Sequence, residues 1–260
     1  MVTSSPCGDP LGEAPLAEAF HRLYIGEAVA RPRKEDTKKL VELGGLLALL
    51  ASSVPARKRE LVGVDAAAGK AYVGLLAAEL IFAARGQAGT VRIIERDEGR
   101  VALCRDAMDR TRAPGFAFET VAADVRDLTA WPNEPDFVVA LHACGPASDA
   151  VLDAAVAVGA KRLFLVPCCT SKAVPFAPFA EGLAERLGIP SQAEVRRPFL
   201  QAMVDAERTL RLESLGYETM VVPFVPKAVT PFNLLWKSVR VREPGRMRAA
   251  EEKLRRLRGA

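Results

Sequence analysis

Three acidic residues, Asp65, Glu95 and Asp124, each follow a short apolar segment in the first half of the chain. The three segments are predicted to be parallel strands, and the carboxyl ends of parallel strands line the crevice in which open α/β sheets bind ligands. A carboxylate at the end of the second strand can accept hydrogen bonds from two adjacent ribose hydroxyls. An acid after the third strand can meet the amino group of an adenine. The three acids therefore indicate a site for a nucleotide-like cofactor.

A turn of small residues, DAAAGKAY over 65–72, connects the first strand to a predicted helix. Small residues are needed where the backbone approaches a cofactor and a helix N-terminus faces it. Ala67 and Ala71 stand where glycines are expected, and alanine reaches positive φ less easily than glycine. The loop alone is equally compatible with a core turn that binds nothing. NAD is a weaker alternative, because the first two glycines of G-x-G-x-x-G are missing and no second substrate domain follows.

Two later loops add a histidine and three cysteines at the same edge. His142 and Cys144 follow the fourth predicted strand, and Cys168 and Cys169 follow the fifth. His142 is either a strand-end residue with locally satisfied nitrogens or a functional group. Zinc is an alternative for this set, but adjacent cysteines chelate poorly compared with C-x2-C, so we predict no metal site. A Cys–His nucleophile pair is disfavoured, because no third group that would orient the histidine is evident.

Strands alternate with helices along the first two thirds of the chain, which predicts a parallel, doubly wound α/β sheet. In the last third a helix ends at Gly216, and the two strands after it are close enough to pair as a hairpin. The predicted strands span 60–64, 90–94, 116–122, 136–141, 162–166, 217–225 and 234–241, and the predicted helices span 16–28, 38–50, 73–84, 100–112, 147–158 and 199–215.

The composition is that of a globular protein: half of the 260 residues are hydrophobic, enough for one large domain. No apolar run approaches the ~18 residues of a membrane span, and the N-terminus lacks a signal-peptide pattern, so we expect no membrane association. Five cysteines form an odd set that favours a reducing cytoplasm over a disulfide framework. Residues 240–260 carry eight Arg or Lys against three Glu, and this segment can contact RNA phosphates or form a solvated helix.

Four motifs occur in an order typical of one protein family. The loop at 65–72 follows D-x-G-x-G-K-G-Y/F with alanines for two glycines, and residues 141–149 follow L-H-x-C-G-x-x-x-D. Residues 167–169 follow a P-C-C motif, and 205–233 follow D-x-E-R…T-P-K-N, with Phe232 in place of the lysine. Together they resemble class I S-adenosylmethionine-dependent methyltransferases of methyltransferase domain family 32. That branch includes methyltransferase-like protein 25 and, more distantly, tRNA 2′-O-methyltransferases.

The resemblance implies a Rossmann-like, mostly parallel seven-stranded sheet with a C-terminal antiparallel hairpin and a helical N-terminal extension. It implies S-adenosyl-L-methionine as cofactor, with Glu95 on the ribose, Asp124 near the adenine and His142 beside the methyl group. We expect a tail and helical extension over 1–55, the methyltransferase domain over 56–242 and a basic tail over 243–260. The cofactor-binding residues implied are Asp65, Ala67, Gly69, Lys70, Tyr72, Glu95, Asp124, Val125, Leu141 and His142.

Methyl transfer from a sulfonium needs alignment of donor and acceptor and exclusion of water more than covalent help. Where the acceptor is a hydroxyl or an amine, a base assists the reaction. His142 is the candidate catalytic residue, because histidine is the side chain that titrates near neutral pH, and Lys70 is the alternative. The acceptor is unidentified, although the resemblance and the basic tail allow RNA. The alternative function is a catalytically degenerate methyltransferase fold that binds a partner, which the two alanines favour.

Overall fold

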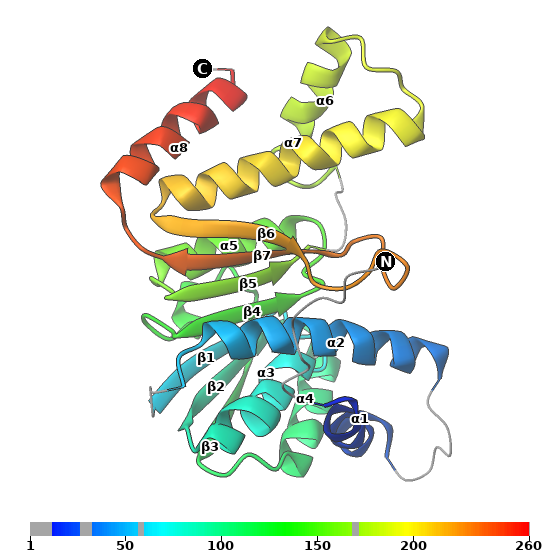
Figure 1. The fold of residues 1–260 in the computed structure, drawn as a ribbon, viewed down its shortest axis with the longest axis vertical. Helices are drawn as coiled ribbons and strands as arrows, with labels where there is room; N and C mark the ends of the chain where they lie inside the picture. The colour runs from blue at the N-terminus through cyan, green and yellow to red at the C-terminus, as the bar shows by residue number, and fades with distance from the viewer. Residues whose placement is uncertain (1–11, 27–32, 57–59, 168–171, 260) are drawn as a thin grey trace, which may run out of the picture.

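The computed structural model describes residues 12–26, 33–56, 60–167 and 172–259. These residues build one seven-stranded sheet with the strand order β3-β2-β1-β4-β5-β7-β6 (Figure 1). The first five strands in the chain are parallel, and β7 runs antiparallel to both β5 and β6. The strands are β1 (Glu60–Ala66), β2 (Ala88–Glu95), β3 (Phe116–Ala122), β4 (Phe137–Leu141), β5 (Arg162–Val166), β6 (Tyr217–Pro223) and β7 (Leu234–Arg240).

The order of the strands confirms the predicted Rossmann-like methyltransferase fold, including the C-terminal antiparallel hairpin. Pairing of Asp65 with Ile93 and Val139, and of Glu95 with Ala122, brings the carboxyl ends of neighbouring strands to one edge of the sheet. The eight α-helices described are α1 (Glu13–Phe20), α2 (Lys34–Ser53), α3 (Tyr72–Ala77), α4 (Glu98–Arg110), α5 (Pro146–Ala157), α6 (Ala177–Arg186), α7 (Ala193–Ser214) and α8 (Pro244–Leu257).

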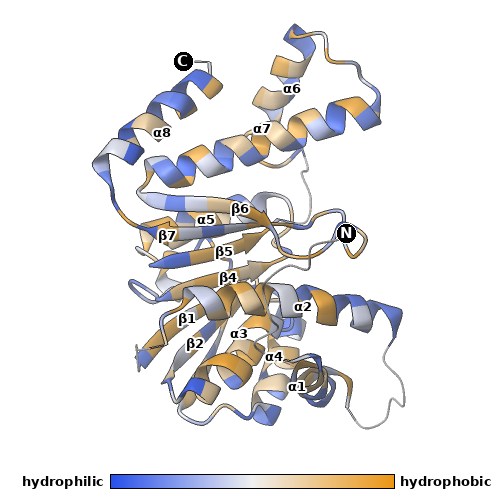
Figure 2. Cartoon of the chain, viewed as in Figure 1, coloured by the Kyte–Doolittle hydropathy of each residue, from blue (hydrophilic) through white to orange (hydrophobic). Residues whose placement is uncertain are grey.

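Successive apolar side chains of the central strands point to opposite faces of the sheet and cover both of them, as expected for parallel strands buried on both sides. In β4, Phe137 and Val139 join a core cluster with α1, α2 and α3, whereas Val138 and Ala140 join a second cluster with α5 and Leu212 of α7. Figure 2 shows the hydrophobic colouring of the central strands and of the helices that cover them. None of the described helices is long and apolar enough to cross a membrane.

The last third of the chain is more helical than expected. Helix α7 begins at Ala193 rather than at residue 199, and Pro198 lies inside it. Proline inside a helix removes one backbone hydrogen bond, so the first turns need other contacts. The early turns are held from outside: the Arg196 guanidinium donates to Glu181 of α6 at 3.0 Å and to the Ile189 carbonyl at 2.8 Å. Helix α6 was not predicted, and α6, α7 and the end of α8 share a third, small apolar cluster.

Candidate functional site

The loop between β1 and α3 follows a glycine-like path although it contains one glycine. Ala67, Gly69 and Ala71 have φ values of 51°, 63° and 57°. For an alanine this left-handed conformation costs roughly 1–2 kcal/mol, so tertiary contacts must hold the loop. Ala68 N–H donates to the Ile94 carbonyl at 3.2 Å, and the Cys104 thiol of α4 contacts the Gly69 carbonyl at 3.4 Å. The two alanines therefore do adopt the backbone conformation of the glycines that they replace.

Asp65 lies at the end of β1 and is 2% exposed. Its Oδ2 accepts a hydrogen bond from Gly74 N–H in α3 at 2.8 Å. A Cβ at Gly74 would lie 3.0 Å from the Asp65 Cβ, so a larger residue would have to displace Asp65 by a few tenths of an ångström. Burial raises the pKa of Asp65 to about 7, and the charge of Glu95 adds to the shift while the Gly74 N–H opposes it. Gly74 was not singled out from the sequence, although it lies five residues after Gly69 at the start of a helix.

Glu95 ends β2 and is 5% exposed. One carboxylate oxygen accepts from Gly69 N–H at 2.8 Å and the other from Asp97 N–H at 3.0 Å. A carboxylate oxygen can accept more than one hydrogen bond, so the same group can still receive ribose hydroxyls. In the protein alone, Glu95 ties the loop after β1 to the end of β2.

Asp124 follows β3 and is bound by its own neighbour. The Arg126 guanidinium donates to both carboxylate oxygens, at 2.8 and 3.0 Å, and the Arg126 backbone N–H adds a third bond at 2.9 Å. These contacts lower the pKa of Asp124 to about 2. Arg126 was not expected here, and a ligand amino group at Asp124 would have to share the carboxylate with it. Val125, between them, is buried, and its carbonyl accepts from the Trp131 indole at 2.9 Å.

His142 follows Leu141 at the end of β4 and has a φ of 63°, a strained value for a residue other than glycine. Its Nε2 lies 2.9 Å from Oε2 of Glu42 on α2, and the Lys39 ammonium donates to the same oxygen at 2.6 Å. Burial raises the pKa of Glu42, but the hydrogen bonds from His142 and Lys39 outweigh it, so the net shift is downward. The sequence showed no group to orient His142, and Glu42 is that group.

Two cavities meet at His142. The larger, of about 430 Å³, is lined by Glu95, Asp124, Val125 and the loop after β4. The smaller, of about 190 Å³, is lined by Asp65, the loop 67–70, Tyr72, Leu141 and Lys39 of α2. Ala67, Arg100 and His142 line both. All ten residues predicted to bind the cofactor thus lie around this pair of cavities. Charged residues at the site that the sequence did not single out are Lys39, Glu42, Arg96, Arg100 and Arg126.

The N-terminal helical segment braces the loop from outside. A π-helical turn, His21–Ile25, follows α1, and its Tyr24 hydroxyl donates to the Ala71 carbonyl at 3.1 Å. The rings of Phe20 and Tyr24 pack on Tyr72, with centroid distances of 5.7 and 4.4 Å. Tyr72 therefore serves both as a cavity wall and as the anchor of the N-terminal segment.

The cysteines do not form the considered metal site among the described residues: no group of three potential ligands is found there. Cys168 and Cys169 lie outside the described residues. Cys144 lines the larger cavity and is disulfide-bonded, whereas Cys104 is free and buried.

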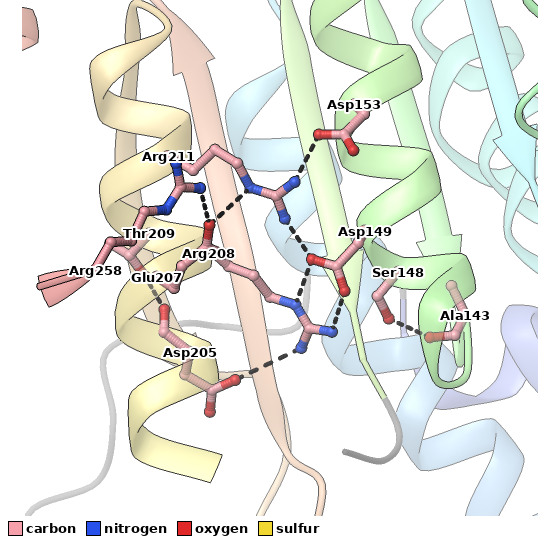
Figure 3. A network of polar contacts seen from close by, with 10 residues as sticks. All are labelled: Ala143, Ser148, Asp149, Asp153, Asp205, Glu207, Arg208, Thr209, Arg211 and Arg258. Carbon is pink, nitrogen blue, oxygen red and sulfur yellow. Dashed lines mark hydrogen bonds and ion pairs between the residues drawn. The ribbon is translucent and has the colours of Figure 1, made fainter. Parts of the chain in front are cut away.

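The other half of the motif pattern has an architectural role. Asp149 of α5 is bound by the Arg208 guanidinium of α7 at 3.2 and 2.7 Å, and Arg211 binds the same carboxylate (Figure 3). Arg208 is fully buried and also pairs with Asp205 at 3.7 Å, while Glu207 pairs with Arg211 and Arg258. The two motifs at 149 and 205–208 are thus one ionic cluster that joins α5 to α7.

Residues 230–233 also have a structural role, in the loop that connects the two strands of the hairpin. The Asn233 side chain donates to the Val225 carbonyl at 2.8 Å, and Phe224 N–H donates to the Asn233 carbonyl at 3.0 Å. A side chain at Gly45 of α2 would come within 2.1 Å of the Phe224 carbonyl oxygen. Asn233 therefore shapes the loop on which α2 packs, while Phe232 is 41% exposed.

Comparison with known proteins supports this reading of the fold. A model of a methyltransferase domain family matches residues 37–174. No curated protein matches the sequence. Similar solved structures include magnesium protoporphyrin IX methyltransferase from Synechocystis PCC 6803 with bound SAH (13% identity, 86% of this chain and 93% of that chain, TM-score 0.49). Further examples are M. capricolum TrmK with S-adenosyl-homocysteine (8% identity, 75% of this chain and 66% of that chain, TM-score 0.42) and a "putative rRNA-methylase" from Clostridium thermocellum (12% identity, 77% of this chain and 96% of that chain, TM-score 0.44).

Proposed function

This chain belongs to the methyltransferase domain family, and from that premise we propose that it transfers a methyl group from S-adenosylmethionine to an acceptor that reaches the cavities at His142. The observation that carries the proposal is the junction of two cavities at the carboxyl edge of the sheet. Their volumes, about 430 and about 190 Å³, together suit one small-molecule ligand with two unlike ends.

The residues present fit this cofactor. In the larger cavity, the Glu95 carboxylate suits a ribose, and the apolar side chains of Val125, Ala143 and Ala147 suit the flat faces of an adenine. In the smaller cavity, the Asp65 carboxylate suits an ammonium group, and Lys39 and Lys70 suit a carboxylate. That pairing of opposite charges matches the amino acid end of S-adenosylmethionine.

S-adenosylmethionine supplies an activated methyl group on a positively charged sulfur. The tasks left to the protein are to align the acceptor, to exclude water and, where the attacking atom carries a proton, to remove it. His142 lines both cavities and is the candidate base. Lys70 is the alternative base at the start of α3.

We further propose membership of the branch that includes methyltransferase-like protein 25, with RNA as the acceptor. The motif resemblance supports the branch, and the C-terminal helix supports the acceptor. Helix α8 buries Ala250 and Leu254 and exposes Arg248, Lys253 and Arg255. Changing these three cations to glutamine is expected to weaken RNA binding and to reduce the dependence of log Kd on log salt by about 2–3. The same change at Arg105, Arg112 and Lys227 is the control, and equal losses in both variants would contradict a role for α8.

A catalytically degenerate fold that binds a partner is the second candidate. It is favoured by the methyl group of Ala67, which lines both cavities, and by Arg126, which occupies Asp124. In that case the same surface would bind a partner without turnover.

Isothermal titration of the whole chain with S-adenosylmethionine, S-adenosylhomocysteine and NAD tests the proposal. We expect micromolar binding of the first two, at least tenfold weaker binding in Asp65→Ala and Glu95→Ala, and no change in Asp109→Ala, an exposed acid on α4. NAD is expected not to bind. Absence of binding by both adenosyl ligands would favour the degenerate fold.

A further inference from the structure

We propose that Glu42 of α2 is a positioning residue for His142: its carboxylate fixes the orientation of the ring and holds the neutral imidazole in the Nε2–H form. This inference rests on the proposed function, in which His142 is the base at the junction of the two cavities. Helix α2, which precedes the sheet in the chain, thereby contributes a functional residue to the site.

Both the imidazole ring and the backbone of His142 make hydrogen bonds to other elements. Nε2 of the ring is 2.9 Å from Oε2 of Glu42, although the two residues are 100 positions apart. The backbone N–H of His142 donates to the Val166 carbonyl of β5 at 3.0 Å. Its φ of 63° is a strained conformation of the kind that persists at functional sites because the surroundings enforce it. The ring and the backbone are therefore fixed by different elements.

The chemistry of the partner decides which nitrogen carries the proton. Glu42 is 7% exposed, yet the hydrogen bonds from His142 and Lys39 leave its pKa below the ordinary value, so it is a carboxylate. An ionised carboxylate only accepts hydrogen bonds, and therefore Nε2 must be the donor. In a neutral imidazole the other nitrogen, Nδ1, then carries the lone pair.

Lys39 shares the same oxygen of Glu42 at 2.6 Å and also lines the smaller cavity. Residues 39 and 42 are three apart on α2, which places both side chains on one face of the helix. The Lys39 ammonium therefore stabilises the charged form of the carboxylate that orients His142.

A fixed base is useful only when the attacking atom of the acceptor carries a proton. The arrangement therefore points to a hydroxyl, or to a nitrogen that loses its proton on methylation, as the acceptor group. Acceptors that attack as anions, such as carboxylates and thiolates, need no such residue.

Nuclear magnetic resonance of the 15N-histidine-labelled chain tests the assignment, because the protein has only two histidines, His21 and His142. A His21→Gln variant assigns their signals. At a pH at which the ring is neutral, we expect His142 to show a proton on Nε2 and a lone-pair nitrogen at Nδ1. The Nε2–H signal should persist in Glu42→Gln, which keeps an acceptor oxygen, and in Lys39→Met. It should be lost to exchange with water in Glu42→Leu, but not in the control Glu35→Leu on the first turn of α2.

A proton on Nδ1 of the wild-type ring would overturn the proposal, because the wild-type spectrum does not depend on whether a variant folds. Persistence of the Nε2–H signal in Glu42→Leu would overturn it as well. Titration of the same samples with S-adenosylhomocysteine distinguishes a failure of the proposed function from a failure of the role of Glu42. Lack of binding by the wild type contradicts the proposed function, whereas normal binding with the wrong tautomer contradicts only the role of Glu42.

Discussion

The loop between β1 and α3 and the ionic cluster between α5 and α7 both contain motif acids, yet they are built in opposite ways. Asp65 is buried, accepts backbone hydrogen bonds from the start of α3, and lies next to another carboxylate and to alanines in a strained conformation. Asp149 is equally buried but is bound by two guanidinium groups. In the first region, two carboxylates that form no ion pair within the described part of the chain and two alanines at positive φ lie beside a cavity. In the second region, arginine side chains neutralise the buried carboxylate of Asp149. Burial of an acid therefore does not by itself distinguish a binding site from a structural ion pair; the partners of the carboxylate do.

The largest effect is expected in the cluster. Arg208→Met leaves Asp149 with one guanidinium in a buried site, and breaking a buried ion pair costs about 3–5 kcal/mol. Urea unfolding followed by circular dichroism measures the loss. Arg248→Met, an exposed arginine on α8, is the control and should change the free energy of unfolding by less than about 0.5 kcal/mol. Similar values for the two variants would contradict the contrast between the regions.

At Asp65, removal of a charge should instead increase the free energy of unfolding. Because the folded-state pKa of Asp65 is about 7 and its ordinary value is 3.8, the folded protein retains a proton that the unfolded chain releases. The stability that protonation contributes is therefore lost as the pH rises towards 7. Asp65→Asn cannot ionise, so it should stabilise the protein by about 2 kcal/mol at pH 8 and by much less at pH 4.

Urea unfolding at both pH values tests this prediction, with Asp109→Asn as the exposed control. The same Asp65→Asn variant should bind S-adenosylhomocysteine more weakly. A stabilised protein with weaker binding would show that the loop sacrifices stability for function. A destabilised variant at pH 8 would show instead that Asp65 is a structural acid like Asp149.

The strained alanines allow a finer test. Ala67→Gly should stabilise the protein by about 1 kcal/mol, because glycine adopts positive φ without the penalty of a Cβ. Ala71→Gly should be close to neutral, since its fully buried methyl group contributes about 0.8 kcal/mol that is lost. Ala68→Gly, in the same loop without positive φ, is the control and should destabilise by about 0.5–1 kcal/mol. Melting temperatures measure all three, and an order with Ala67→Gly below Ala68→Gly would contradict the strain.

The smallest effect is expected at the rim of the cluster. Asp153 pairs with Arg211 at 2.7 Å, but its side chain is 59% exposed, and exposed pairs contribute about 0–1 kcal/mol. Burial and the nearby acids raise the pKa of Asp153 and so offset this pair. Asp153→Asn should therefore change the free energy of unfolding by less than about 0.5 kcal/mol, and added salt should reduce the difference. An effect as large as that of Arg208→Met would show that the cluster acts as one unit up to its surface.

Local sequence determined most of the strands and the residues at their ends. The short apolar segments predicted β3 and β5 with their observed bounds, and the acids at the carboxyl ends of β1, β2 and β3 do lie at one edge of the sheet. Neighbouring residues specify the period of a strand. The right-handed connection between parallel strands is general, so it brings their carboxyl ends to the same edge. The motif order likewise pointed to the methyltransferase family.

The tertiary structure alone decided which charges are satisfied. Glu42 reaches His142 across 100 positions, and Arg208 reaches Asp149 across 59. Arg126 covers Asp124 although it is only two residues away, and the alanines at 67 and 71 take up glycine conformations. Sequence patterns report the period of an element and the size of a side chain. Burial and hydrogen bonding, which set the charge of Asp65 and the orientation of His142, depend on the distances between elements after they have packed.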